Sequence, residues 1–122
     1  MTDLHTFALL LGDLSPRTEL IDGRIFLDRY GRGKAALLKE IAKYDNAKTA
    51  QQWINMVPID DFLDCAVSDW SINDPLILEV VDIYRRSWLS TIKAQYEICD
   101  DLSVEVLKDE SAGDVIVRLN QL

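Results

Sequence analysis

Apolar residues recur at every third or fourth position over most of the chain, a pattern typical of helices that bury one face. The clearest example begins at Asp74, whose side chain suits the cap of a helix with Pro75 as its first residue. From there to about Ile98 the apolar residues form one stripe, namely Ile77, Val80, Val81, Tyr84, Trp88, Ile92 and Tyr96. The spacing predicts one long amphipathic helix over residues 74–98.

Three shorter helices are predicted upstream of this long helix. They cover residues 33–44, residues 49–57 and, after the interruption at Pro58, residues 59–70. The stretch Glu19–Tyr30 is ambiguous, because its apolar residues fit a short hairpin that turns at Asp22-Gly23 as well as a helix broken there. For this stretch we favour irregular or strand structure.

The period changes to two near the C-terminus, which indicates strands. Val104 and Val106 precede a polar loop at residues 109–113, and Val115, Val117 and Leu119 follow it. We therefore predict a β-hairpin with one buried face. Because two strands alone are only marginally stable, we expect a third strand from residues 20–30 or from a partner chain. The expected fold is mainly α within the α+β class: a compact domain of about four to five helices with a C-terminal β-hairpin.

The length of 122 residues and the apolar content of 48% predict a single globular domain over residues 1–122. The apolar run Phe7–Leu11 is short, and it has neither a preceding Lys or Arg nor a small-residue cleavage site, so we expect no signal peptide and no membrane span. Cys65 and Cys99 lack a CxxC or histidine partner. We favour two free thiols in a reducing cytoplasm over a structural disulfide.

Charge is distributed unevenly along the chain. Residues 1–57 carry a net charge of +1 and residues 58–122 a net charge of −9, and no basic residue lies between Lys48 and Arg85. The acidic residues in this interval are Asp60, Asp61, Asp64, Asp69, Asp74, Glu79 and Asp82. A surface of this kind repels nucleic acid and anionic membranes and attracts a basic protein.

Helical geometry places Asp60, Asp61 and Asp64 opposite the apolar side of the helix over 59–70, so we expect them to be clustered and exposed. Carboxylates in the first turns also stabilise a helix through its dipole, which is a structural reason for their presence there. That reason does not extend to Asp69, Asp74, Glu79 and Asp82. The whole set therefore predicts an acidic binding surface, and Trp70 becomes an anchor within it if its side chain is exposed.

Catalytic and metal-binding motifs are not convincing in this chain. Gly31-Arg32-Gly33-Lys34 is similar to the end of a phosphate loop, but Asp28 stands where the first glycine belongs and Ala35 replaces the hydroxyl residue that binds magnesium. Asp60 and Asp64 are one helical turn apart and could share a hard cation, although no known metal-site spacing accompanies them. We expect no enzymatic activity, no cofactor and no metal.

The chain resembles the small acidic immunity proteins that bacteria carry beside secreted toxins, such as those of contact-dependent growth inhibition systems. The resemblance rests on size, on the single-domain build and on the run Pro58-Ile59-Asp60-Asp61-Phe62-Leu63-Asp64 through Asp74. It implies a cytoplasmic inhibitor, without catalysis, that binds and neutralises a basic partner protein, namely a cognate toxin such as a nuclease. The expected partner-binding residues are Asp60, Asp61, Asp64, Asp69, Trp70, Asp74, Glu79 and Asp82.

A second interpretation remains open from the sequence. The protein could be a helical adaptor or a homo-oligomeric regulatory domain with an apolar partner surface, in which case the excess acid serves solubility. A phage protein that mimics nucleic acid would show the same charge and size. Salt separates the first two interpretations, because docking of exposed charges weakens as salt screens them, whereas apolar docking does not.

Overall fold

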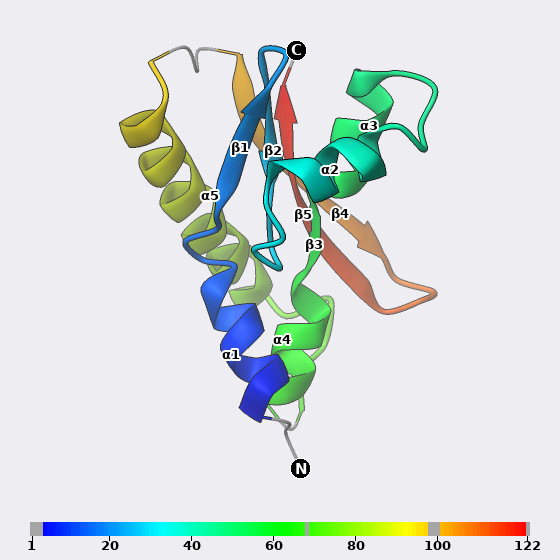
Figure 1. The fold of residues 1–122 in the computed structure, drawn as a ribbon. Helices are drawn as coiled ribbons and strands as arrows, with labels where there is room; N and C mark the ends of the chain where they lie inside the picture. Colours follow the sequence, from blue (N-terminus) through cyan, green and yellow to red (C-terminus); the bar gives the residue numbers. More distant parts are fainter. Residues whose placement is uncertain (1–3, 68, 98–100, 122) are drawn as a thin grey trace.

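The computed structural model describes residues 4–67, 69–97 and 101–121 and shows an α+β fold (Figure 1). In chain order the elements are α1 (Leu4–Gly12), β1 (Thr18–Ile21), β2 (Arg24–Leu27), α2 (Lys34–Ile41), α3 (Ala47–Ile54), β3 (Met56–Pro58), α4 (Ile59–Ala66), α5 (Leu76–Gln95), β4 (Leu102–Asp109) and β5 (Asp114–Gln121). Figure 1 shows α5 along one side of the strands and α2 with α3 on the other, while α1 and α4 lie together at one end.

The expectation of a mainly helical domain with one hairpin is wrong. Within the described ranges there are five strands in two antiparallel sheets, one with the order β1-β2 and one with the order β3-β5-β4. The three strands that the helical interpretation missed or left open are only three or four residues long. Such short segments contain too few positions for a period of two to be distinguished from one turn of a helix.

Of the two alternatives for Glu19–Tyr30, the structure shows the hairpin. β1 and β2 pair antiparallel around the turn at Asp22-Gly23, with Leu20 opposite Ile25. Asp22 has a φ of 51° and Gly23 a φ of 78°. Two successive residues with positive φ are the requirement of the tight hairpin turn that follows the twist of the strands, and Asp-Gly is a preferred pair for it.

The third strand of the C-terminal sheet comes from neither of the two expected sources. β3 pairs with β5, with Val57 opposite Val117, so the helix predicted over 49–57 ends at Ile54 instead. The intervening Asn55 is fully buried. Its backbone carbonyl accepts the N–H of Leu119 (3.2 Å), and its side-chain oxygen accepts the N–H of Leu27 (2.8 Å). These bonds replace the helical ones and turn the chain into the sheet.

Buried amide side chains join the two sheets. Gln121 Oε1 accepts the backbone N–H of Ile25 (3.1 Å), and both Gln51 and Asn55 donate to the carbonyl of Ile25 (3.0 and 2.9 Å). Gln51 also donates to Gln121 (2.9 Å). Side chains thus form the hydrogen bonds to the backbone groups of β2 that point away from β1. These bonds connect the two sheets where a neighbouring strand would otherwise pair with β2.

The main core lies between α5 and the three-stranded sheet. Tyr84, Trp88 and Ile92 of α5 are buried in one cluster with valines and leucines of β4 and β5. The predicted C-terminal hairpin is confirmed, with Val104 opposite Leu119 and its buried face towards this cluster.

The predicted long helix is present as α5, but it begins at Leu76 instead of Pro75 and ends at Gln95 instead of near residue 98. The side chain of Asp74 accepts the N–H of Leu76 (3.0 Å) at its beginning. The helix predicted over 59–70 ends earlier, at Ala66. Within the described ranges, no helix combines the length and the apolar character that crossing a lipid bilayer requires. The prediction of two free thiols involves Cys99, which lies outside the described residues.

Candidate partner-binding site

The seven acidic residues predicted as a binding surface lie on α4, on the connection that follows it and on the first half of α5. We call them the acidic surface: Asp60, Asp61, Asp64, Asp69, Asp74, Glu79 and Asp82. They fall into two groups. In one group the carboxylate accepts a hydrogen bond or forms an ion pair within the protein, and in the other it does neither among the described residues.

Two of the aspartates on α4 hold other elements in place. Asp60 is only partly exposed, and its Oδ1 accepts the backbone N–H of Val115 on β5 (3.0 Å). Asp64 Oδ1 accepts the indole N–H of Trp70 (2.8 Å). Trp70 itself is partly buried against the main core, so its contact with Asp64 ties the connection after α4 back to that helix.

Two acidic residues at α5 also bond to other groups of the protein. Asp74 caps the helix through the N–H of Leu76, as described above. Asp82 forms ion pairs with Arg86 (2.9 Å) and Arg85 (3.7 Å) on its own helix. All three side chains of this cluster are well exposed, so these pairs contribute little to stability. They do reduce the charge that Asp82 presents to a partner.

Asp61, Asp69 and Glu79 remain, and within the described part of the chain they form no ion pair. All three are exposed. For Asp61, partial burial is the largest cause of a pKa above its ordinary value of 3.8, and the neighbouring carboxylates Asp60, Asp64 and Asp114 raise that pKa further against the opposing effect of Arg29. The α4 end of the acidic surface therefore holds more negative charge than the fold neutralises.

Asp114 belongs to this acidic group although sequence reasoning missed it. It is the first residue of β5, more than fifty positions after Asp61, and it acts on the pKa of Asp61 only because β5 packs on α4. No local pattern in the sequence marks this neighbour.

Exposed apolar side chains accompany the acidic residues on α5. Leu76, Leu78 and Ile83 are 60%, 58% and 48% exposed. With Glu79, Asp82 and Arg86 they form what we call the α5 outer face, on which Leu78, Glu79, Asp82, Ile83 and Arg86 line a shallow depression. These leucines and Ile83 lie outside the buried stripe of the helix, which is the signal in the sequence that could have identified them.

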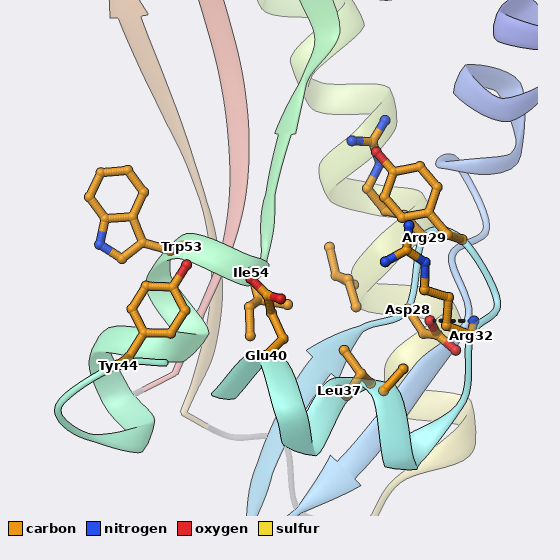
Figure 2. A pocket seen from close by; sticks show the side chains of 11 residues that line it. Asp28, Arg29, Arg32, Leu37, Glu40, Tyr44, Trp53 and Ile54 are labelled. Atoms are coloured by element: carbon orange, nitrogen blue, oxygen red, sulfur yellow. Dashed lines mark hydrogen bonds between the residues drawn. The ribbon is translucent and has the colours of Figure 1, made fainter. Parts of the chain in front are cut away.

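A second surface, which sequence reasoning did not predict, surrounds a cavity of about 280 Å³. It lies between α2, α3 and the connection at residues 28–33. Figure 2 shows Tyr44 and Trp53 at one end and Arg29 with Arg32 at the other. We call it the aromatic cavity, and its lining residues are Leu27, Asp28, Arg29, Tyr30, Arg32, Ala36, Leu37, Glu40, Tyr44, Trp53 and Ile54.

Asp28 determines the path of the connection at the cavity. This side chain is 7% exposed, and its two oxygens accept the backbone N–H groups of Arg32 (3.1 Å) and Gly33 (3.0 Å). Gly31 has a φ of 62°, and a Cβ there would lie 1.9 Å from Nη1 of Arg17. The N–H groups that a phosphate loop would offer to its ligand are thus already bonded to a carboxylate of the chain.

Arg29 is held by a buried carboxylate on the other side of the connection. Asp13, which is 2% exposed, accepts two hydrogen bonds from the Arg29 guanidinium (2.7 and 3.0 Å). Burial alone would lower the pKa of Arg29, but the hydrogen bond and charge of Asp13 outweigh burial and raise it above its usual value. The indole of Trp88 donates to the backbone carbonyl of Asp13 (2.6 Å), which anchors this pair to the main core.

The connection presents two side chains to solvent. The Tyr30 ring is 59% exposed and lies 5.5 Å from the guanidinium carbon of Arg29 and 5.2 Å from that of Arg32. Arg32 is exposed and has no ion pair within the described residues. Residues 29–48 contain six Lys/Arg and two Asp/Glu, a net charge of +4. The lining of the aromatic cavity itself is balanced in charge, because it contains Asp28 and Glu40 as well as Arg29 and Arg32.

A metal centre has no support in the described part of the chain, where no group of three His, Cys, Asp or Glu side chains is placed to hold an ion. Comparisons of the chain with protein-family models, with curated proteins and with solved structures gave no match. The interpretation of the two surfaces therefore depends on their own geometry and charge.

Proposed function

We propose that the protein is an inhibitory binding protein that neutralises a basic partner through its acidic surface, with a nuclease toxin as the class of partner. The observation that supports this proposal best is the composition of the α5 outer face. Leu76, Leu78 and Ile83 are about half exposed, and Glu79, which shares a depression with Arg86, forms no ion pair among the described residues. Exposed apolar side chains among charged ones are a common feature of protein interfaces.

The two kinds of side chain have different roles in such an interface. The exposed carboxylates of Asp61, Asp69 and Glu79 would attract a basic surface over a distance of about a Debye length and so speed association. Leu78 and Ile83 would exclude water once the surfaces meet, which slows dissociation. A nuclease must bind a polyanion, so its active site has the basic charge that this surface complements.

The structure decides which acidic residues make a clean test. Reversal of Asp60 or Asp64 would remove hydrogen bonds to Val115 and Trp70 and would confuse a loss of folding with a loss of binding. Asp61, Asp69 and Glu79 are exposed and have no such bond to any of the described residues. The triple variant Asp61→Lys, Asp69→Lys, Glu79→Lys therefore tests the surface, and Asp45→Lys, Glu97→Lys, Glu110→Lys is its control with the same change in net charge at exposed positions elsewhere.

The experiment compares the wild type with these two variants as baits in a lysate of the native cell, at low and at high salt, and identifies retained proteins by mass spectrometry. We expect one basic protein that the wild type and the control retain at low salt and that the surface variant loses. The purified pair should form a 1:1 complex, and the partner's activity should fall on binding. If the surface variant and its control retain the same proteins, or if the purified pair is insensitive to salt, the acidic surface is not the binding site.

A further inference from the structure

The aromatic cavity has no role in the function proposed above, although the chain fixes its shape closely. Two buried carboxylates, Asp13 and Asp28, hold the connection at residues 28–33, and Gly31 packs against Arg17. Walls that are held in place before a ligand arrives reduce the ordering cost of binding.

The fold leaves few of the charged groups that line the cavity for a ligand. Both oxygens of Asp28 accept backbone N–H groups, and a buried carboxylate binds the guanidinium of Arg29. Arg32 is exposed, and its guanidinium forms no hydrogen bond or ion pair among the described residues. Glu40 pairs through Oε2 with the exposed Lys43 (3.0 Å), whereas its Oε1 has no bond to the described part of the chain. One cation and one carboxylate oxygen therefore remain for a ligand.

These two charged groups and the aromatic rings follow one another along the cavity. Figure 2 shows Arg32 at one end and Tyr44 with Trp53 at the other. Glu40 lies between the two ends, on α2. It is one helical turn after Ala36, and at about 1.5 Å of rise per residue this turn spans about 6 Å along the helix. The charged groups and the rings are thus arranged on the scale of one small molecule.

We infer that the aromatic cavity binds a free α-amino acid with an aromatic side chain. Such a molecule has a carboxylate, an ammonium group and a ring in the same order as the groups of the cavity. Its carboxylate binds the guanidinium of Arg32, its ammonium group binds Glu40, and its ring packs on Trp53. The ligand has no net charge, which agrees with a lining of two acidic and two basic residues.

The size of the cavity agrees with a ligand of this class. Its volume of about 280 Å³ is at the lower limit of the range for small-molecule sites. The buried side chains of Leu27 and Leu37 and the partly buried Ile54 supply the apolar part of the lining. This combination of an apolar lining with a few polar groups is typical of sites that fix the orientation of a small molecule.

Other ligands use fewer of these groups. An aromatic acid without an ammonium group would leave Glu40 beside a second carboxylate, and an aromatic amine would leave Arg32 unpaired. An aromatic residue inside a peptide chain carries neither charge. A nucleotide phosphate finds no backbone donors in the connection, because the N–H groups of Arg32 and Gly33 are bonded to Asp28.

The test uses L-phenylalanine as the probe and three analogues that each lack one of its features. L-Phenylalaninamide lacks the carboxylate, 3-phenylpropanoate lacks the ammonium group, and L-alanine lacks the ring. Calorimetric titration of the full chain measures the four affinities. We expect each analogue to bind at least about tenfold more weakly than L-phenylalanine, because each leaves one group of the cavity without its partner. The NMR signal of the exposed Trp53 indole N–H should shift during the titration, and that of the buried Trp88 should not.

Two variants locate the ends of the ligand. Arg32→Gln should weaken the binding of L-phenylalanine and of 3-phenylpropanoate by about tenfold or more and leave that of L-phenylalaninamide nearly unchanged. Glu40→Gln should weaken the binding of L-phenylalanine and of L-phenylalaninamide and leave that of 3-phenylpropanoate nearly unchanged. Lys34→Gln and Asp45→Asn are the matched controls, since both residues are exposed and lie outside the lining.

Absence of binding at about 10 mM L-phenylalanine, where even a millimolar affinity is saturated, would overturn the inference. Equal affinity for L-phenylalaninamide would also overturn it and would assign the cavity to the N-terminal residue of a peptide. Equal weakening of all probes by Arg32→Gln would show that this guanidinium maintains the shape of the cavity instead of binding a carboxylate. The result is separable from the proposed function, because both variants keep the acidic surface and must still bind the basic partner if that proposal is right.

Discussion

Around the aromatic cavity, the carboxylates of Asp13 and Asp28 are buried and fully bonded, whereas on the acidic surface Asp61 and Glu79 are exposed and form no ion pair among the described residues. The difference follows from the cost of burial. A carboxylate removed from water must be paired or hydrogen-bonded, or it would not remain charged. An exposed carboxylate keeps its water, so the fold tolerates several of them together.

This comparison distinguishes buried carboxylates that stabilise the fold from exposed carboxylates that can contact a partner. Asp13 and Asp28 shape a connection that exposes Tyr30 and Arg32. Asp61, by contrast, has a raised pKa, caused first by partial burial and then by its acidic neighbours. Such a group destabilises the folded protein at neutral pH, and a basic partner would relieve that repulsion.

The largest loss of unfolding free energy should come from Asp13→Ala. It leaves the largely buried Arg29 guanidinium without its partner, which commonly costs about 3–5 kcal/mol of unfolding free energy. Urea unfolding measures the loss. Glu79→Ala is the matched change on the acidic surface, and we expect it to stay within about 0.5 kcal/mol of the wild type. Equal losses for the two variants would contradict the distinction drawn here.

Asp28→Ala should cause the next largest loss of unfolding free energy, about 1–3 kcal/mol, because two backbone N–H groups lose their acceptors. The change should be local, and amide hydrogen exchange of Arg32 and Gly33 should accelerate. Asp28→Asn keeps one acceptor oxygen and should lose less protection than the alanine variant. Unchanged exchange at both amides in Asp28→Ala would show that Asp28 does not hold the connection.

Asp61→Asn should act in the opposite direction and stabilise the protein at neutral pH. Because the pKa of folded Asp61 lies above its ordinary value, the folded state binds the proton more tightly, and stability falls as pH rises through that pKa. The gain in melting temperature should therefore disappear below pH 3.8, where the wild-type carboxyl is protonated in both states. A lower melting temperature at neutral pH would instead show that attraction to the α4 dipole outweighs the repulsion.

The smallest effect on stability should come from Trp53→Ala. Its side chain is 60% exposed, so we expect a change within about 0.5 kcal/mol in thermal unfolding. A much larger loss would mean that Trp53 serves the core rather than the surface of the cavity.

Long periodic segments were predictable, and short ones were not. The stripe from Ile77 to Ile92 identified α5, and alternation identified the C-terminal hairpin, because each covers enough positions to define its period. β3 is three residues long and follows a helical pattern without a break, so its pairing with β5 could not be read locally. The amides of Gln51, Asn55 and Gln121 gave no signal either, since their partners are distant in the chain.

The acidic surface shows the same limit. Its residues were identifiable from the gap in basic residues between Lys48 and Arg85. The sequence did not show which of their carboxylates already bond within the protein and which can contact a partner. Contacts with Val115 and Trp70 engage Asp60 and Asp64, and the structure adds Asp114 to the group. The aromatic cavity combines a connection after β2 with residues of α2 and α3, and only their packing brings Tyr30 and Trp53 to one opening.

For this protein, then, the sequence by itself determined the helix α5, the hairpin at the C-terminus and the separation of a nearly neutral from an acidic half, because each depends on residues close together in the chain. The tertiary structure alone decided the two-sheet architecture, which carboxylates form no ion pair among the described residues, and the cavity between α2, α3 and the connection after β2. Those features depend on hydrogen bonds and burial between segments far apart in the sequence, and burial determines whether a charge must be compensated within the fold or can stay exposed to a partner.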